Sequence, residues 1–190
     1  MIFNQLFDDK SSTYTYIISS GKGREALIID PVIEHTKKYI KILKDLELKL
    51  VKVIDTHIHA DHISGLNELN KQTECTRIMG EESESEVIDL RVKENEKVKI
   101  EGIELITLYT PGHTKCSYSY LMNDRVFTGD TLLINGSGRT DFQGGSAMEQ
   151  YDSIFNKLLK LPDKTLVYPA HDYNGKKFST VENERNNNPR

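Results

Sequence analysis

The sequence predicts an α/β domain in which two β-sheets lie between helices. Two observations lead to this prediction. Short β-branched and aromatic segments, typical of strands, alternate with longer segments whose apolar residues recur at helical spacing. In addition, no linker or low-complexity segment divides the 190 residues, so we expect residues 1–190 to form one domain with its own core.

The first predicted feature is an antiparallel hairpin. Residues 13–18 alternate in polarity, residues 26–29 are apolar, and Gly21 and Gly23 lie between the two runs. The dipeptide Asp30-Pro31 ends the second strand.

A helix, a strand and a second helix are expected next. Residues 34–47 place Tyr39 and Leu43 on one face of a helix. The apolar, β-branched run 50–55 predicts a buried strand, and a second helix is expected over residues 61–70.

The second half of the chain predicts more strands and two further helices. The strands are expected at residues 103–109, 117–122, 125–128 and 165–168. A capping box at residues 146–149 opens a helix that Pro162 ends, and a second capping box occupies residues 179–182. We expect the apolar residues of the first of these helices to be core, namely Tyr151, Ile154, Phe155, Leu158 and Leu159.

Composition excludes several classes of function. The net charge of −4 argues against nucleic acid as a partner, and no apolar run is long enough to cross a bilayer. No secretory or transit peptide is visible at the N-terminus, and the two cysteines do not suggest a disulfide framework. We therefore expect a cytoplasmic protein with Cys75 buried, while the role of Cys116 is left open.

The segment 57–62 carries the strongest chemical signal. It contains His57, His59, Asp61 and His62 directly after the predicted strand 50–55. Imidazole and carboxylate groups together suit zinc, iron, manganese or nickel. The internal position of the segment and the interleaved aspartate argue against a solvated histidine patch, so we predict a metal site.

Three further metal-capable residues follow predicted strands. They are His113, Asp130 and His171, each beside a Gly or Pro that permits a sharp turn. If these strands share a sheet edge, the three residues converge with the histidine segment. Five of the six histidines follow this pattern, and the exception is His35.

The pattern His-x-His-x-Asp-His, with a later His, Asp and His, resembles the metallo-β-lactamase superfamily over the whole chain. The resemblance implies an αββα sandwich of two mixed sheets, with the metal at its mouth. It specifies the fold more closely than the reaction, because hydrolases and oxygenases of the superfamily share these ligands.

Two later stretches resemble the persulfide dioxygenases (sulfur dioxygenases). One runs from Phe127 through Thr128-Gly129-Asp130-Thr131 to Gly145, and the other is Tyr168-Pro169-Ala170-His171-Asp172-Tyr173, followed by Asn188-Pro189-Arg190. Relatives usually continue past this last motif. The resemblance implies an enzyme that converts glutathione persulfide, O₂ and water to glutathione and sulfite, in persulfide detoxification.

The same resemblance implies roles for the ligand candidates. One iron(II) per chain would be held by His57, His113 and Asp130, a two-histidine, one-carboxylate triad with open coordination positions. The remaining candidates would orient these ligands or form a second metal site; they are His59, Asp61, His62 and His171. The residues alone leave one metal and two metals equally open.

Substrate contacts are expected from three residues. Arg139 can bind a glutathione carboxylate with its guanidinium, unless it pairs structurally with Asp141. From the family pattern, Tyr173 is expected beside the reacting sulfur as a catalytic residue, and Arg190 beside the peptide.

Two other functions stay open. A glyoxalase II-like thioester hydrolase (hydroxyacylglutathione hydrolase) would use two metals, zinc or iron, to generate hydroxide. A non-catalytic persulfide sensor or carrier would use the same fold without turnover. The oligomeric state is not revealed, and a homodimer is compatible with the sequence.

Overall fold

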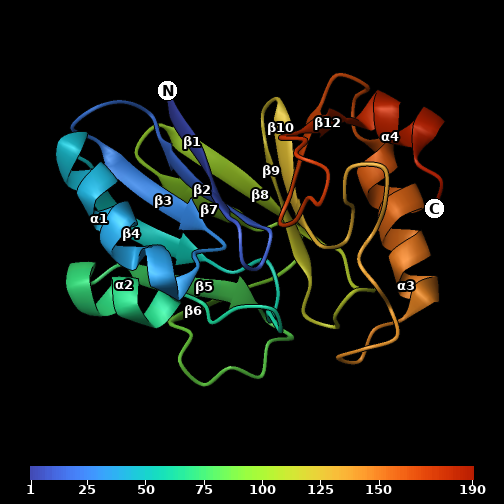
Figure 1. Cartoon of the computed structure of the whole chain (residues 1–190), viewed down its shortest axis with the longest axis horizontal. Helices are drawn as coiled ribbons and strands as arrows, with labels where there is room; N and C mark the ends of the chain where they lie inside the picture. The colour runs from blue at the N-terminus through green and yellow to red at the C-terminus, as the bar shows by residue number, and fades with distance from the viewer.

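The computed structural model describes residues 1–190 and has four layers, with two sheets between two pairs of helices (Figure 1). Helices α1 (Thr36–Asp45) and α2 (Leu66–Thr73) cover the outer face of the first sheet. Helices α3 (Ala147–Asp152) and α4 (Val181–Asn187) cover the outer face of the second sheet. The predicted arrangement of two sheets between helices is confirmed.

Each sheet combines parallel and antiparallel pairs. In the first, β1, β2 and β3 pair antiparallel and β3 to β6 pair parallel. Its strands are β1 (Ile2–Asp8), β2 (Thr13–Ser19), β3 (Glu25–Ile29), β4 (Lys49–Ile54), β5 (Thr76–Gly80) and β6 (Leu90–Val92). In the second, β10 and β11 are the parallel pair. Its strands are β7 (Lys97–Ile100), β8 (Ile103–Tyr109), β9 (Tyr118–Met122), β10 (Arg125–Gly129), β11 (Leu166–Pro169) and β12 (Ser179–Thr180).

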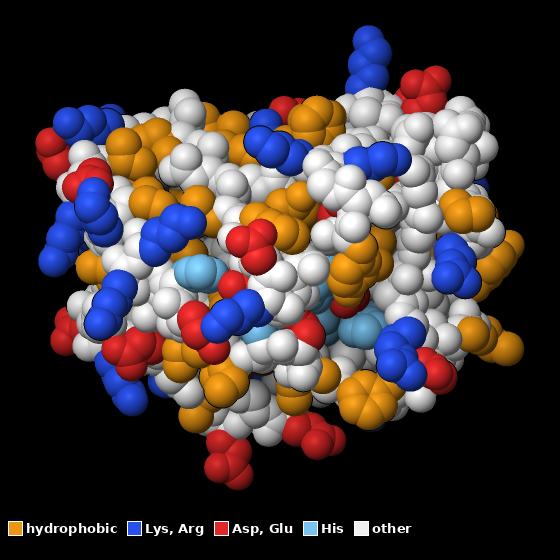
Figure 2. All heavy atoms as spheres, in the orientation of Figure 1, with side chains coloured by type: hydrophobic (Ala, Val, Ile, Leu, Met, Phe, Trp, Pro, Cys, Tyr) orange, Lys and Arg blue, Asp and Glu red, His pale blue; other side chains and the backbone are white.

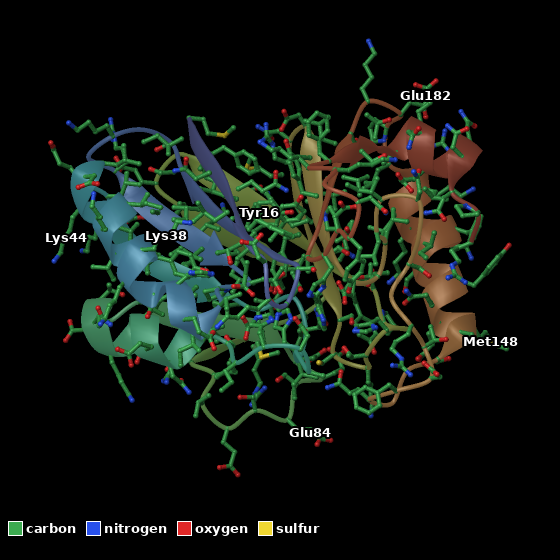
Figure 3. All side chains as sticks on the ribbon, viewed as in Figure 1. Tyr16, Lys38, Lys44, Glu84, Met148 and Glu182 are labelled. Carbon is green, nitrogen blue, oxygen red and sulfur yellow. The ribbon has the colours of Figure 1, made fainter.

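An aromatic cluster joins the inner faces of the two sheets. Tyr16 from β2 is fully buried, and its ring centroid lies 4.9 Å from that of Phe127 on β10 and 5.7 Å from that of Tyr168 on β11. Figure 3 shows Tyr16 near the centre of the molecule, while Lys44 and Glu84 extend from its edges. Because aromatic pairs contribute beyond their buried area, this cluster fixes the two sheets relative to each other.

Two helix predictions need correction and one is confirmed. The helix expected over residues 61–70 begins only at Leu66, because the residues before it form the loop that carries the metal candidates. The cap at Ser146 is confirmed, since its side chain accepts a hydrogen bond from the Glu149 amide. The other capping box is shifted by one residue, because Thr180 rather than Ser179 caps α4.

The helix after Ser146 is also less regular than expected. After α3 the chain continues as a π-helical turn over Ser153–Lys157 and a 3₁₀ turn over Leu158–Lys160. This changes the face that the helix presents to the sheet. Tyr151 is 60% exposed, so its prediction as core is wrong, whereas Ile154, Leu158 and Leu159 are buried as expected.

The metal candidates follow strands of both sheets. The segment 57–62 follows β4 of the first sheet, and His113, Asp130 and His171 follow β8, β10 and β11 of the second. The residues therefore meet where the ends of two sheets come together, rather than along one sheet edge. None of the helices has the length and apolar character needed to cross a membrane.

Candidate metal centre

Three groups of metal-capable side chains lie at this junction, and one of them consists of Asp30, Asp55 and His59. The first group is His57, His113 and Asp130, whose potential ligand atoms all lie within 4.8 Å of one another. The Asp130 Oδ2 atom is 4.0 Å from His57 Nε2 and 3.5 Å from His113 Nε2. Figure 2 shows histidine side chains reaching the surface in a hollow near the middle of this face.

The outer nitrogen of each histidine in the first group is fixed by a hydrogen bond. Thr56 Oγ1 donates to the Asp30 carboxylate at 2.9 Å, so it accepts from His57 Nδ1, also at 2.9 Å. His113 Nδ1 donates to the Arg139 carbonyl at 2.8 Å. Both rings therefore carry their proton on Nδ1 and turn the lone pair of Nε2 toward Asp130, which is the form that binds a metal.

Burial and charge favour the ligand forms of this group. Burial lowers the pKa of His57 to about 3, with a further contribution from His59, so the ring is neutral. Burial alone would raise the pKa of Asp130, but His171, His57 and His113 outweigh it and keep the carboxylate ionised. Two imidazoles that turn Nε2 inward and one carboxylate fit a divalent metal of the iron or zinc type.

Two glycines permit the backbone to pass close to these ligands. Gly129 has a φ of +53°, and a Cβ there would lie 2.7 Å from Thr56 Oγ1. A Cβ on Gly138 would lie 2.3 Å from the Asp130 carbonyl oxygen and 2.8 Å from His113 Nδ1. Any larger residue at either position would displace the groups that hold the histidines.

The second group is His59, Asp61 and His62, whose potential ligand atoms also lie within 4.8 Å of one another. His59 Nε2 bonds Asp30 at 3.2 Å, and His62 Nδ1 bonds Asp61 at 2.8 Å. The other nitrogens, His59 Nδ1 and His62 Nε2, are buried and have no hydrogen-bond partner. An unpartnered buried nitrogen calls for a cation or an ordered water.

His171 joins the two groups. Its Nδ1 bonds Asp130 at 2.7 Å and its Nε2 bonds Asp61 at 2.9 Å. Burial disfavours a charged ring, yet the two carboxylates prevail and raise the pKa of His171 to about 10. The Thr13 hydroxyl also reaches Asp61 and His171, at 3.1 Å each.

A cavity of about 380 Å³ opens onto the first group, and we call it the catalytic pocket. Its lining includes Asp130, His113, Arg139, Phe142 and Tyr173. The Tyr173 ring is 71% exposed and lies parallel to that of His171, with centroids 6.2 Å apart.

Arg139 lines the catalytic pocket, whereas Arg190 does not. The Arg139 guanidinium forms two hydrogen bonds with Asp141, at 2.7 and 3.1 Å, on the exposed surface. Arg190 lines a neighbouring cavity of about 400 Å³ instead of the catalytic pocket. The loop that carries Ser137, Gly138 and Arg139 lines both cavities.

Sequence reasoning missed two groups that support the site. Asp30 is fully buried after β3, and it accepts from the Thr56 amide and hydroxyl and contacts His59. Its signal in the sequence is a carboxylate directly past a strand, the same pattern that identifies Asp130, but the following Pro31 makes the position typical of a simple strand end. No sequence pattern points to Thr13, because the residues that it contacts, Asp61 and His171, are far away in the chain.

The chain matches a family model described as the metallo-beta-lactamase superfamily over residues 8–171. It is 42% identical over 197 residues to "Persulfide dioxygenase ETHE1, mitochondrial" of Mus musculus, covering 100% of this chain and 76% of the relative. It is 34% identical to "Hydroxyacylglutathione hydrolase" of Dictyostelium discoideum, covering 92% of this chain and 68% of the relative.

Solved structures agree with these matches. The crystal structure of ETHE1 from Myxococcus xanthus is similar with a TM-score of 0.98 at 45% identity, covering 100% of this chain and 84% of that one. A metallo-beta-lactamase from Staphylococcus aureus has a TM-score of 0.89 at 28% identity, covering 99% of this chain and 61% of that one.

Proposed function

The chain belongs to the metallo-beta-lactamase superfamily and, within it, to the persulfide dioxygenases, and from this we propose that it oxidises glutathione persulfide with O₂ and water to glutathione and sulfite. The proposal rests above all on the similarity of the whole chain, at 40–42% identity, to animal persulfide dioxygenases. The hydroxyacylglutathione hydrolases match at 34% identity.

Membership of the superfamily implies a bound metal. We propose one iron(II) per chain, held by His57, His113 and Asp130. The free Nε2 lone pairs of both histidines and the ionised carboxylate support this set, and their side facing the catalytic pocket is open to substrate. When bound, iron(II) supplies the open coordination positions and the redox chemistry that O₂ activation requires.

The supporting residues have distinct proposed roles. Thr56 and the Arg139 carbonyl orient the two ligand histidines through their Nδ1 atoms. His171 fixes one oxygen of Asp130 and so leaves the other, Oδ2, facing the imidazoles. Asp61 lines the other side of the pocket and is held there by His62 and His171, while His59 bonds the buried Asp30.

The substrate is proposed to lie along the pocket wall formed by Tyr173 and Arg139. Tyr173 presents an exposed ring beside His171, where it can contact the reacting sulfur. The Arg139 guanidinium can turn from Asp141 to a glutathione carboxylate, because an exposed ion pair is weak. Arg190, in the neighbouring cavity, can reach only a part of the peptide that extends past the Ser137–Arg139 loop.

A glyoxalase II-like hydrolase is the second candidate. The unpartnered His59 Nδ1 and His62 Nε2 favour it, because a second metal among His59, Asp61 and His62 would satisfy both nitrogens. Two metals, zinc or iron, would then generate hydroxide for thioester cleavage. Against it, both ring nitrogens of His171 are already bonded to carboxylates.

Location and assembly stay predictions from the sequence. We propose a cytoplasmic protein, although the animal relatives are named as mitochondrial. A homodimer is compatible with the proposed function, and the expected partners are small molecules rather than nucleic acid or membrane.

An oxygen-electrode assay on protein loaded with iron(II) tests the proposal. With glutathione persulfide, we expect O₂ uptake and sulfite release in equal amounts, with about one iron bound per chain. The zinc-loaded protein is the matched control and should consume no O₂. Hydrolysis of a glutathione thioester, two metals per chain and no O₂ uptake would instead identify the hydrolase. Persulfide binding without any turnover would indicate a sensor or carrier.

A further inference from the structure

A buried glutamine that belongs to none of the metal motifs contacts the loops that carry the first group. Gln150 lies on α3, and only 4% of it is exposed. Its side-chain nitrogen, Nε2, lies 2.8 Å from the Thr131 carbonyl oxygen, 3.4 Å from that of Asp130 and 3.5 Å from that of Gly138. Because three carbonyl oxygens surround this atom, it is the donor end of the amide, and its two N–H groups tie the three carbonyls together.

The three carbonyls belong to segments that place Asp130 and His113. Asp130 and Thr131 directly follow β10, and the Gly138 amide donates to the Asp130 carbonyl at 2.8 Å. Gly138 is followed by Arg139, whose carbonyl accepts the hydrogen bond from His113 Nδ1. If Gly138 moved away from the residues after β10, the carbonyl that orients the His113 ring would move with it.

The same helix also contacts the loop that leads to His113. At the start of the helix, the Ser146 amide donates to the Gly112 carbonyl at 2.8 Å. Gly112 packs directly against Gln150, since its φ is +140° and a Cβ there would lie 2.3 Å from Gln150 Cα. Gln150 therefore touches the loop before His113 with its backbone and the residues around Asp130 with its amide.

We propose that Gln150 is a positioning residue of the metal centre: its amide keeps Asp130 Oδ2 and His113 Nε2 directed toward each other, at the 3.5 Å that the structure shows. The inference rests on the proposed ligand set of His57, His113 and Asp130. His57 is oriented separately, because its Nδ1 bonds Thr56, which has no hydrogen bond to Gln150. Loss of the amide should therefore affect His113 and leave His57 unchanged.

The test replaces the amide by a side chain of similar length and shape that has no N–H group. Gln150→Met leaves the carbonyl of the fully buried Thr131 without the donor that it has in the wild type, so the segments that the amide joins can separate. Gln72→Met, which removes an exposed amide bonded to Glu68 on α2, is the matched control. Gln150→Leu repeats the change with a second apolar side chain, so that the result does not depend on how Met alone fits.

Nitrogen NMR of the metal-free protein, at a pH where the histidines are neutral, reports the position of each ring proton. In the wild type, His57 and His113 should both carry the proton on Nδ1, because each Nδ1 has an acceptor. In Gln150→Met we expect His113 to shift toward the form with the proton on Nε2, which histidine prefers in water, while His57 keeps its proton on Nδ1. A residue that contributes only to overall stability would change both rings alike or neither.

Metal binding provides the second measurement, with zinc as the probe in competition with a chromophoric chelator. Gln150→Met should bind zinc about tenfold more weakly than the wild type, and Gln72→Met should bind it equally well. The inference is overturned if the His113 proton stays on Nδ1 or if the zinc affinity of Gln150→Met matches that of Gln72→Met, however stable the variant is. A wild-type protein that binds its metal but releases no sulfite overturns the proposed reaction instead, since neither measurement depends on turnover.

Discussion

The two histidine groups of the site differ in what each ring does with its nitrogens. In the first, His57 and His113 bond a threonine hydroxyl and a carbonyl through Nδ1 and share Asp130 through Nε2. In the second, His59 and His62 bond carboxylates through one nitrogen and leave the other without a partner. A histidine of the motif can therefore bind the metal or orient a group that does. The hydrogen bonds of its ring nitrogens distinguish these two roles better than its position in the motif does.

The largest effect is expected from the first group. Asp130→Ala should lose both the bound metal and the activity, because Asp130 is the single carboxylate that faces both His57 and His113. Metal analysis and the oxygen electrode measure the two losses. Asp141→Ala, which removes an exposed carboxylate, is the control and should keep its metal. An Asp130→Ala protein with a full metal complement would remove Asp130 from the ligand set.

A change in the second group tests whether the chain binds one metal or two. His62→Ala should keep one metal per chain and lose activity on the order of 10- to 100-fold, as expected for a residue that supports a ligand without binding the metal. His57→Ala, changed in the same way within the same loop, should lose the metal. If wild-type protein holds two metals and His62→Ala holds one, both groups bind metal and the hydrolase becomes the better proposal.

A smaller effect is expected on the pocket wall beside the first group. Arg139→Ala should keep its iron, because the carbonyl that holds His113 belongs to the backbone. Its KM for glutathione persulfide should rise about tenfold, the equivalent of one exposed charge-assisted hydrogen bond. Asp141→Asn, which frees the guanidinium, should leave KM equal or lower. Unchanged persulfide kinetics in Arg139→Ala would remove Arg139 from substrate binding.

The contrast between the groups also explains what the sequence could predict. Strand alternation and the turn residues after strands depend on neighbours in the chain, so most strands and all seven metal candidates were found from local patterns. Several partners of the ring nitrogens lie far away in sequence, such as Arg139 for His113 or Asp30 for His59. Local patterns do not contain this information.

The same reasoning accounts for the errors in the fold. The assignment of β4 to one sheet and β10 to the other follows from packing around Tyr16, which periodicity does not report. Tyr151 has the spacing of a core residue, but the π-helical turn after it alters the buried face. The late start of α2 reflects the loop that the metal candidates require.

The smallest effect on activity is expected from a change outside both groups, where Asp8 joins Ser11 to His35, and this change acts on stability instead. Because the folded-state pKa of Asp8 is about 2 and its ordinary value is 3.8, its ionised form stabilises the fold. This contribution is complete above pH 4 and is lost as the pH falls through about 2; it amounts to roughly 2 kcal/mol. Urea unfolding of metal-free protein at neutral pH should therefore show Asp8→Asn less stable than wild type, with the gap closing near pH 2. Asp9→Asn, which changes the exposed neighbouring carboxylate, should match wild type throughout. If the difference in unfolding free energy between Asp8→Asn and wild type stays the same at pH 2, Asp8 contributes through packing and not through its charge.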